Sequence, residues 1–164
     1  MDQLWAPWRL AYVTKEPQSD DGGDCFLCRG LSETDDRRNL IVHRSALGTV
    51  VLNRYPYNNG HLLVAPRAHK GQLDELAAKE VLELQQLIAR MVVVLERTMR
   101  PAGFNVGLNL GKAAGAGLPG HLHWHIVPRW DGDTNFMPIL TDVRVISQSL
   151  DALYDLLTAG LATP

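Results

Sequence analysis

The sequence predicts an α+β protein built around an antiparallel sheet, and three observations support this prediction. Short apolar runs of β-type composition follow one another along the chain, and one long segment between them shows helical periodicity instead. Near residue 123, histidines alternate with apolar residues at the two-residue period of a strand. Strands in runs, with helices set apart from them, are typical of α+β folds with antiparallel sheets.

The overall composition excludes several classes of protein. The chain has 164 residues, 46% hydrophobic and 21% charged, which suits one ordinary globular domain. Its net charge of −2 gives no electrostatic basis for broad nucleic-acid binding. No apolar run is long enough to span a bilayer, and residues 1–5 lack the pattern of a signal peptide. We therefore expect a cytoplasmic protein that binds neither nucleic acid nor membrane.

The first 24 residues divide into an aromatic arm and a polar loop. Residues 1–12 include Trp5, Trp8 and Tyr12, so we expect this arm to dock on the body of the protein or on a partner subunit. Residues 14–24 are polar and rich in turn formers, which predicts a mobile loop.

Four of the predicted strands are short apolar runs bounded by turn residues. They are residues 40–43 and 49–52, which we expect to form a hairpin, followed by 61–66 and 104–109. Residues 55–60 have the composition of a turn. Pro66 ends the third strand, because proline cannot donate to a strand ladder.

Two helices are predicted from apolar periodicity and stop signals. Apolar residues recur at three- and four-residue steps from Leu73 to Met99, which predicts one long helix whose apolar stripe packs in the core. The residues that follow, 100–103, include a proline and a glycine that end it. A second helix is expected from about Ser147 to Leu157.

The fifth predicted strand carries His121, His123 and His125 in strict alternation. Leu122, Trp124 and Ile126 fill the gaps, so a strand here would present one apolar face and one face of imidazoles. Residues on the same face of a strand lie roughly 6.5–7 Å apart. Three of the six histidines of the chain cluster here, which favours a site for one elongated ligand over a chance arrangement.

The connection before this strand is rich in glycine. Gly111, Gly115, Gly117 and Gly120 would let main-chain N–H groups approach an anion closely, as in phosphate-binding nests. It is not a Walker loop, because Lys112 is followed by alanine and the segment leads into a strand. Beside three histidines, the composition favours phosphate binding over a plain flexible turn.

Histidine can attack phosphorus when its ring is neutral and one ring nitrogen is held by a hydrogen bond. His123 is the middle residue of the three, so one neighbour could orient it while the other donates to phosphoryl oxygens or to the leaving group. A site that only binds a metal is the competing interpretation, since histidine is also a common metal ligand.

These motifs together resemble the histidine triad (HIT) family. His121 to His125, followed by Ile126 and Val127, fit the His-x-His-x-His-x-x motif that names the family. Residues 60–69 are similar to the Gly-His strand of the family and to the turn before its long helix, and residues 109–111 also match. Residues 128–130 and 135–136 are most similar to the bacterial diadenosine-polyphosphate phosphorylase and Fhit-like hydrolase branch, and less to the Hint phosphoramidase branch.

The resemblance implies a fold, an assembly and a role for each matching residue. The fold is a half-barrel of about five antiparallel strands packed on the long helix, with a C-terminal helix, and such proteins are usually homodimers. His123 matches the nucleophile that forms a nucleotidyl-histidine intermediate, and His121 matches the histidine that orients it. His61 and His125 match residues at the phosphates. Asn109 matches a residue near the sugar and α-phosphate, and Gly115 and Gly117 lie in the predicted phosphate-binding loop.

One segment departs from the family pattern. Many relatives carry Gln, Ser or Thr side chains toward the phosphates just before the three histidines, where this chain has Gly117, Leu118 and Pro119. Main-chain amides would have to replace those side chains, and Pro119 has no amide hydrogen to donate.

The only two cysteines, Cys25 and Cys28, form a Cys-x-x-Cys motif with three possible meanings. They could be a redox pair, two inert thiols, or half of a zinc site. Some HIT proteins and the related galactose-phosphate uridylyltransferases use the equivalents of Cys25, Cys28, His69 and His121 as zinc ligands. By that resemblance we expect a structural zinc ion, since four nitrogen and sulfur ligands leave no open position.

The expected function is cleavage of dinucleoside polyphosphates, such as diadenosine tetraphosphate, by a nucleotidyl hydrolase or transferase. The alternatives are a nucleotide phosphoramidate hydrolase, or a nucleotide-binding or partner-binding module with vestigial catalysis. We expect a single HIT-like domain over residues 1–164. It would comprise the arm and loop (1–24), a core (25–130) and a C-terminal extension with a helix (131–164).

Overall fold

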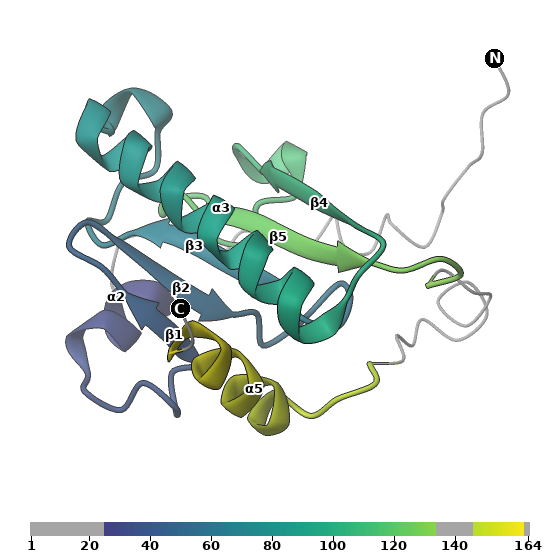
Figure 1. Cartoon of the computed structure of the whole chain (residues 1–164). Coiled ribbons are helices and arrows are strands. Elements are labelled where there is room, and N and C mark those ends of the chain that lie inside the picture. The colour runs from purple at the N-terminus through teal and green to yellow at the C-terminus, as the bar shows by residue number, and fades with distance from the viewer. Residues whose placement is uncertain (1–24, 134–145, 163–164) are drawn as a thin grey trace, which may run out of the picture.

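A computed structural model of the protein describes residues 25–133 and 146–162. Within these residues, five strands form one antiparallel sheet in the order β1-β2-β3-β5-β4 (Figure 1). The strands are β1 (Ile41–Arg44), β2 (Gly48–Leu52), β3 (Leu62–Pro66), β4 (Gly103–Leu108) and β5 (Trp124–Arg129). This architecture confirms the α+β class and the antiparallel five-stranded sheet. The aromatic arm with Trp5, Trp8 and Tyr12 lies outside the described residues.

One face of the sheet is covered by two helices, α3 (Ala78–Met99) and α5 (Leu150–Ala162), which lie side by side in front of it in Figure 1. Gly48 on β2 faces α3, because a Cβ atom there would lie 2.6 Å from the side chain of Leu87. Strand alternation puts Val50 and Leu52 on the same face as Gly48. The core therefore lies between the sheet and α3, where Leu84, Met91, Leu95, Val50, Leu62 and Ile126 have no appreciable exposure.

The long helix is shorter at its start than the apolar pattern predicts. A separate 3₁₀ turn, η2 (Leu73–Glu75), precedes α3, and Ala77 between them is extended with ψ near 152°. The Glu80 carboxylate accepts a hydrogen bond from the Ala77 N–H at 2.8 Å, which caps the helix. Leu73 is 46% exposed. Leu73 fitted the apolar periodicity that predicted the helix, but its side chain lies at the surface and does not pack in the core.

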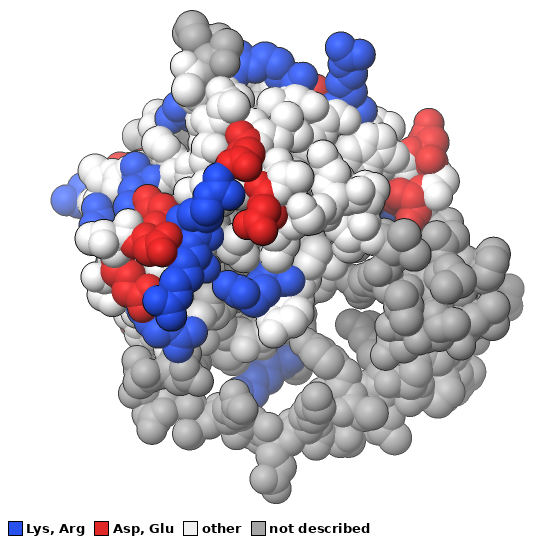
Figure 2. Space-filling model, turned by 90° about the horizontal axis from the view of Figure 1, so that it is seen from below, with Lys and Arg blue, Asp and Glu red and all other residues white. Residues whose placement is uncertain are grey.

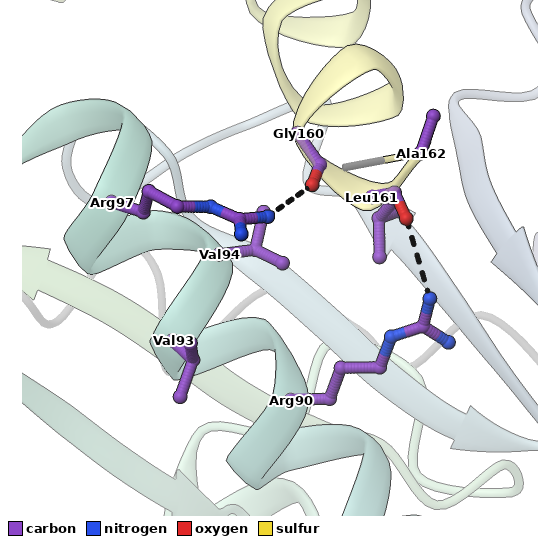
Figure 3. A pocket seen from close by; sticks show the side chains of 7 residues that line it. All are labelled: Arg90, Val93, Val94, Arg97, Gly160, Leu161 and Ala162. Carbon is purple, nitrogen blue, oxygen red and sulfur yellow. Dashed lines mark hydrogen bonds between the residues drawn. The ribbon is translucent and has the colours of Figure 1, made fainter. Parts of the chain in front are cut away.

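The C-terminal helix, Leu150–Ala162, begins three residues later and ends five residues later than expected. Arg97 Nη2 donates to the Gly160 carbonyl at 2.6 Å, and Arg90 Nη2 donates to the Leu161 carbonyl at 3.5 Å (Figure 3). These arginines satisfy carbonyls in the last turn of α5, which have no partner within the helix. Leu157 is fully buried between the two helices and the sheet.

Two short elements, one beside the cysteines and one in the glycine-rich connection, were not predicted from the sequence. Helix α2 (Phe26–Ser32) begins directly after Cys25, whose sulfur accepts from the Cys28 N–H and so caps it. A 3₁₀ turn, η3 (Lys112–Ala114), lies within the glycine-rich connection. The other predicted strands end within one or two residues of their observed bounds.

The histidine strand is shorter than the alternation suggests. Strand β5 begins only at Trp124, so His121 and His123 precede it. The Leu122 N–H donates to the Lys70 carbonyl at 2.7 Å instead of to a neighbouring strand. The prediction of one continuous strand from residue 121 is therefore wrong, and a contact with a distant loop is the reason.

The surface carries both signs of charge close together. Figure 2 shows Lys and Arg side chains interleaved with Asp and Glu on one face of the molecule. Ion pairs among the described residues join Arg37 to Asp151 and Asp155, and Arg44 to Asp36. Across residues 25–133 and 146–162, none of the helices combines the length and apolar character required to cross a membrane.

Candidate active site and metal centre

Three imidazoles meet on the face of the sheet opposite α3. His125 on β5 pairs with Leu63 on β3, and neither residue shares the face of Val50 and Leu52 that packs on α3. His61, directly before β3, places its Nε2 atom 2.9 Å from Nδ1 of His125. The rings of His123 and His125 are 5.1 Å apart between centroids. The structure thus brings together His61, His123 and His125, which are up to 64 residues apart in the chain.

The geometry around His123 fixes which ring nitrogen carries the proton. Its Nδ1 atom lies 2.8 Å from the carbonyl oxygen of His121. A carbonyl oxygen can only accept, so Nδ1 carries the hydrogen and Nε2 keeps its lone pair. Burial lowers the pKa of His123, an effect larger than the opposing contribution of this hydrogen bond. The ring is therefore neutral near pH 7, with one nitrogen available as a nucleophile.

His125 is neutral for the same physical reason. Burial, together with the neighbouring His123 ring, lowers the pKa of His125 to about 4. Its Nε2 atom is buried and has no hydrogen-bond partner among the described residues. A buried polar atom without a partner is costly, and such atoms often mark places where a ligand binds.

His121 does not share this site, although the alternation predicted three imidazoles on one face. Its side chain is fully buried and turned toward the cysteines, with Nδ1 3.2 Å from Sγ of Cys25. Its Nε2 atom donates to the Pro66 carbonyl at 2.9 Å. The main-chain oxygen of His121 accepts from Nδ1 of His123, so the His121 carbonyl orients the ring of the middle histidine.

The glycine-rich connection folds back on Asn109. Asn109 Nδ2 donates to the Gly115 carbonyl at 3.4 Å, across the turn that contains η3. Gly111 and Gly115 have φ angles of +74° and +86°, a conformation that favours glycine. Gly117 needs no such explanation, because its φ is not positive and a Cβ atom there would meet nothing within 4 Å. The segment adjoins β5, since Leu108 at the end of β4 pairs with Trp124.

The segment that departs from the family pattern, residues 117–119, has no side chain that can form a hydrogen bond. The Leu118 side chain packs against the hydrophobic core, and its carbonyl accepts from the His121 N–H at 3.4 Å. Leu118 therefore acts as a packing residue at the entry to the histidine segment.

Cys25, Cys28, His69 and His121 form a cluster in which all four ligand atoms lie within 4.8 Å of one another. Sγ of Cys28 lies 3.3 Å from Nδ1 of His69 and 3.5 Å from Nδ1 of His121. The start of helix α2 creates half of the cluster, because Cys25 caps the helix and its sulfur accepts from the N–H of Cys28 in the first turn. Burial and the adjacent Cys25 thiol raise the pKa of Cys28 to about 11, so an ion must displace its proton on binding.

Sequence reasoning missed two residues that contact the histidines. Asn53 Nδ2 lies 3.2 Å from Nδ1 of His61, and the Tyr57 N–H donates to the same nitrogen at 3.0 Å. The Tyr57 ring also stacks on His125, with 5.7 Å between centroids. Residues 55–60 could be recognised only as a turn, and nothing in their spacing indicated these contacts.

Comparison with known proteins identifies the family. The HIT domain model matches residues 36–132, which is more than half of the chain. The chain belongs to the histidine triad family. This membership confirms the resemblance drawn from the three histidines and the Gly-His strand.

Relatives and solved structures agree with this assignment. An AP-4-A phosphorylase of Mycobacterium tuberculosis is 40% identical over 154 residues, covering 92% of this chain and 79% of that protein. A bis(5'-nucleosyl)-tetraphosphatase (asymmetrical) of Schizosaccharomyces pombe is 30% identical, covering 57% of this chain and 50% of that protein. A zinc-bound HIT family protein from Mycobacterium smegmatis superposes with a TM-score of 0.67 at 25% identity, covering 85% and 94% of the two chains.

Proposed function

We propose that this HIT protein is an enzyme that cleaves dinucleoside polyphosphates through a nucleotidyl-histidine intermediate on His123. The single observation that carries the proposal is the state of the His123 ring. Its Nδ1–H is held by the His121 carbonyl at 2.8 Å, so the lone pair at Nε2 is available in a neutral ring beside two further imidazoles. The similarity to an AP-4-A phosphorylase and to a bis(5'-nucleosyl)-tetraphosphatase supports this substrate class.

In the first step, Nε2 of His123 attacks the α-phosphorus of the dinucleotide. A P–N bond forms, and the bond from phosphorus to the bridging oxygen breaks. The electron pair of that bond leaves with the second nucleotide as its terminal phosphate. The Nδ1–H to carbonyl hydrogen bond stabilises the positive charge that develops on the ring.

In the second step, an acceptor attacks the same phosphorus and the P–N bond returns its electron pair to Nε2. Water as acceptor gives a mononucleotide, and the proton that water loses passes to solvent or to a neighbouring base. Inorganic phosphate as acceptor gives a nucleoside diphosphate. Neutral donors in the site, including the Nε2–H of His125, would hold the phosphoryl oxygens during both steps.

The experiment that tests this proposal is incubation with diadenosine tetraphosphate, with and without inorganic phosphate, followed by identification of the products. We expect turnover that is lost by at least about a thousandfold in His123→Ala, while nucleotide binding is kept. Rapid quenching with labelled nucleotide should trap label on His123 as a phosphoramidate, which is lost in acid and kept in base. Label on a serine or an aspartate, or activity that survives His123→Ala, would refute the covalent mechanism.

We also propose that the four-residue cluster binds a structural zinc ion. Tetrahedral zinc with sulfur at about 2.3 Å and nitrogen at about 2.0–2.1 Å places its ligands roughly 3.3–3.8 Å apart. The sulfur–nitrogen distances of 3.2, 3.3 and 3.5 Å in the cluster are close to that range. Nδ1 of His121 faces the sulfurs, and the hydrogen on its other ring nitrogen, Nε2, is donated to the Pro66 carbonyl. A metal-bound histidine usually makes such a hydrogen bond with its second ring nitrogen. The zinc-bound relative from Mycobacterium smegmatis supports the same assignment.

Such an ion would act on the reaction only through structure. It would fix the His121 main chain, whose carbonyl in turn holds the His123 ring. With four protein ligands, it would have no open position for substrate.

We further propose that the protein is a homodimer joined through β4. This strand lies at the edge of the sheet, and Asn105, Val106 and Gly107 on it are exposed. Val106 is 47% exposed and Leu110 just beyond the strand is 46% exposed, which leaves an apolar surface beside unpaired strand groups. Sedimentation of the wild type and of Val106→Lys tests this. A wild-type monomer at micromolar concentration would contradict it.

A further inference from the structure

The loop between β2 and β3 contacts the histidine site through one side-chain amide and one main-chain amide. Asn53 Nδ2 lies 3.2 Å from Nδ1 of His61, and the Tyr57 N–H lies 3.0 Å from the same nitrogen. The ends of the loop are joined, because the Asn53 N–H donates to the His61 carbonyl at 3.0 Å. Two groups therefore converge on a single ring nitrogen of a fully buried histidine.

The orientation of the Asn53 amide follows from its second contact. Its Oδ1 atom accepts from the Tyr55 N–H at 3.0 Å, so its NH₂ group must be the part that faces His61. The Tyr57 main-chain N–H can only donate. Because both neighbours are donors, Nδ1 of His61 must be the unprotonated nitrogen of the ring. The proton of the neutral His61 ring is then on Nε2.

The proton on Nε2 of His61 also determines which ring nitrogen of His125 carries a proton. Nε2–H of His61 donates to Nδ1 of His125, 2.9 Å away. His125 therefore has its lone pair on Nδ1 and its proton on Nε2. That Nε2–H is buried and has no acceptor among the described residues. A phosphoryl oxygen that reached it after a small shift of the covering side chains would satisfy this donor.

We propose that Asn53 is a positioning residue for the reaction. Together with the Tyr57 N–H, it sets the tautomer of His61, and through His61 it sets the tautomer of His125. His125 then presents an N–H donor, and not a lone pair, to the phosphoryl or leaving-group oxygen of the substrate. Asn53 acts entirely through the two imidazoles in this proposal. The kinetic consequence rests on the proposed cleavage of dinucleoside polyphosphates, whereas the proton positions do not.

Ring-nitrogen NMR of nucleotide-free protein labelled with ¹⁵N-histidine tests the proton positions directly. In the wild type we expect an unprotonated Nδ1 on His61 and a protonated Nε2 on His125. Asn53→Asp keeps an oxygen for the Tyr55 N–H but replaces the donor with an acceptor, so a proton should appear on Nδ1 of His61. A protonated Nδ1 in the wild type, or ring signals of His61 that do not change in Asn53→Asp, would overturn the proposal.

Steady-state kinetics with diadenosine tetraphosphate test the consequence for turnover. Asn53→Asp should lower kcat at least about tenfold with a smaller change in KM, since a wrong tautomer impairs chemistry more than binding, whereas Asn53→Ala keeps the Tyr57 N–H as a donor to Nδ1 and should lower kcat less. Asn58→Ala is the matched control. Asn58 lies in the same loop and donates to the Pro128 carbonyl and to Asp133, so its loss loosens the loop without touching an imidazole. We expect its kcat and ring signals to match the wild type.

The outcomes separate this proposal from the proposed function. An Asn53→Asp variant that raises KM alone and keeps the wild-type ring signals would show a direct substrate contact and overturn the positioning role. Equal losses in Asn53→Asp and Asn58→Ala would show general damage to the loop and overturn it as well. A wild type that cleaves no dinucleoside polyphosphate would refute the proposed function, while the NMR comparison would still decide the proton positions.

Discussion

Acidification should destabilise the protein through His125, and the size of the effect follows from its burial. Burial, with the neighbouring His123 ring, lowers the pKa of His125 from 6.5 to about 4 in the folded protein. In the unfolded chain the ring titrates near its ordinary value of about 6.5. Between pH 6.5 and 4 the unfolded chain therefore binds one more proton at this residue than the folded protein does.

The sign of the effect follows from proton linkage. The free energy of unfolding rises with pH wherever the unfolded state binds more protons, by about 1.4 kcal/mol per pH unit for one proton. The contribution of His125 is complete above pH 6.5 and is lost as the pH falls toward 4. A difference of 2.5 units, 6.5 minus 4, sets an upper limit of about 3.5 kcal/mol, which screening by solvent lowers because the His125 side chain is only partly buried.

Urea unfolding at a series of pH values measures this contribution, if wild type and His125→Gln are compared. Metal ligands and other groups also titrate in acid, but they do so equally in both proteins and cancel in the difference. We expect the stability difference between the two proteins to change by up to about 3 kcal/mol between pH 7 and pH 4, with the wild type losing more. Parallel pH dependence in the two proteins would refute a buried neutral His125.

Three further predictions concern catalysis, the metal centre and packing. Because burial lowers the pKa of His123, the acid limb of the pH profile of kcat/KM should lie below pH 6.5, and a limb above pH 7 would contradict a neutral nucleophile. Protein purified without added metal should contain about one zinc per chain, and Cys25→Ser with Cys28→Ser should remove it and lower the thermal midpoint; metal-free protein with freely titrating thiols would contradict this. Gly160→Ala should destabilise by about 1–3 kcal/mol in urea unfolding, because its Cβ would lie 2.8 Å from Thr98 Cγ2. Gly103→Ala is the control, since a Cβ there meets nothing within 4 Å, and equal losses in the two variants would contradict the packing argument.

Local patterns in the sequence were sufficient for the class of fold, the family and most of the element positions. Helical periodicity located α3 to within five residues at its start, and it ended where predicted, at Met99. Short apolar runs bounded by turn residues located β1 to β4 to within one residue, because both signals are local to the chain. The residue types that carry the proposed chemistry, three histidines beside a glycine-rich connection, were also visible without the structure.

Only the tertiary structure decided which imidazoles meet. Alternation predicted that His121, His123 and His125 share a face, but it holds only within a regular strand, and β5 begins at Trp124. The Lys70 carbonyl holds the Leu122 N–H, so the chain at residue 121 follows a distant loop and its ring turns to the cysteines. His61 takes the place beside His125 because β3 and β5 pair with Leu63 opposite His125.

The protonation states of the site depend still more on the tertiary structure. The acceptor for the His123 Nδ1–H is a main-chain carbonyl, and the donors to Nδ1 of His61 are a main-chain N–H and the Asn53 amide. Every residue carries the same main-chain groups, so the sequence cannot indicate which of them reaches a ring nitrogen. The residue types of the site are therefore a property of the sequence. Their tautomers and their low pKa values arise from burial and from contacts between segments far apart in the chain.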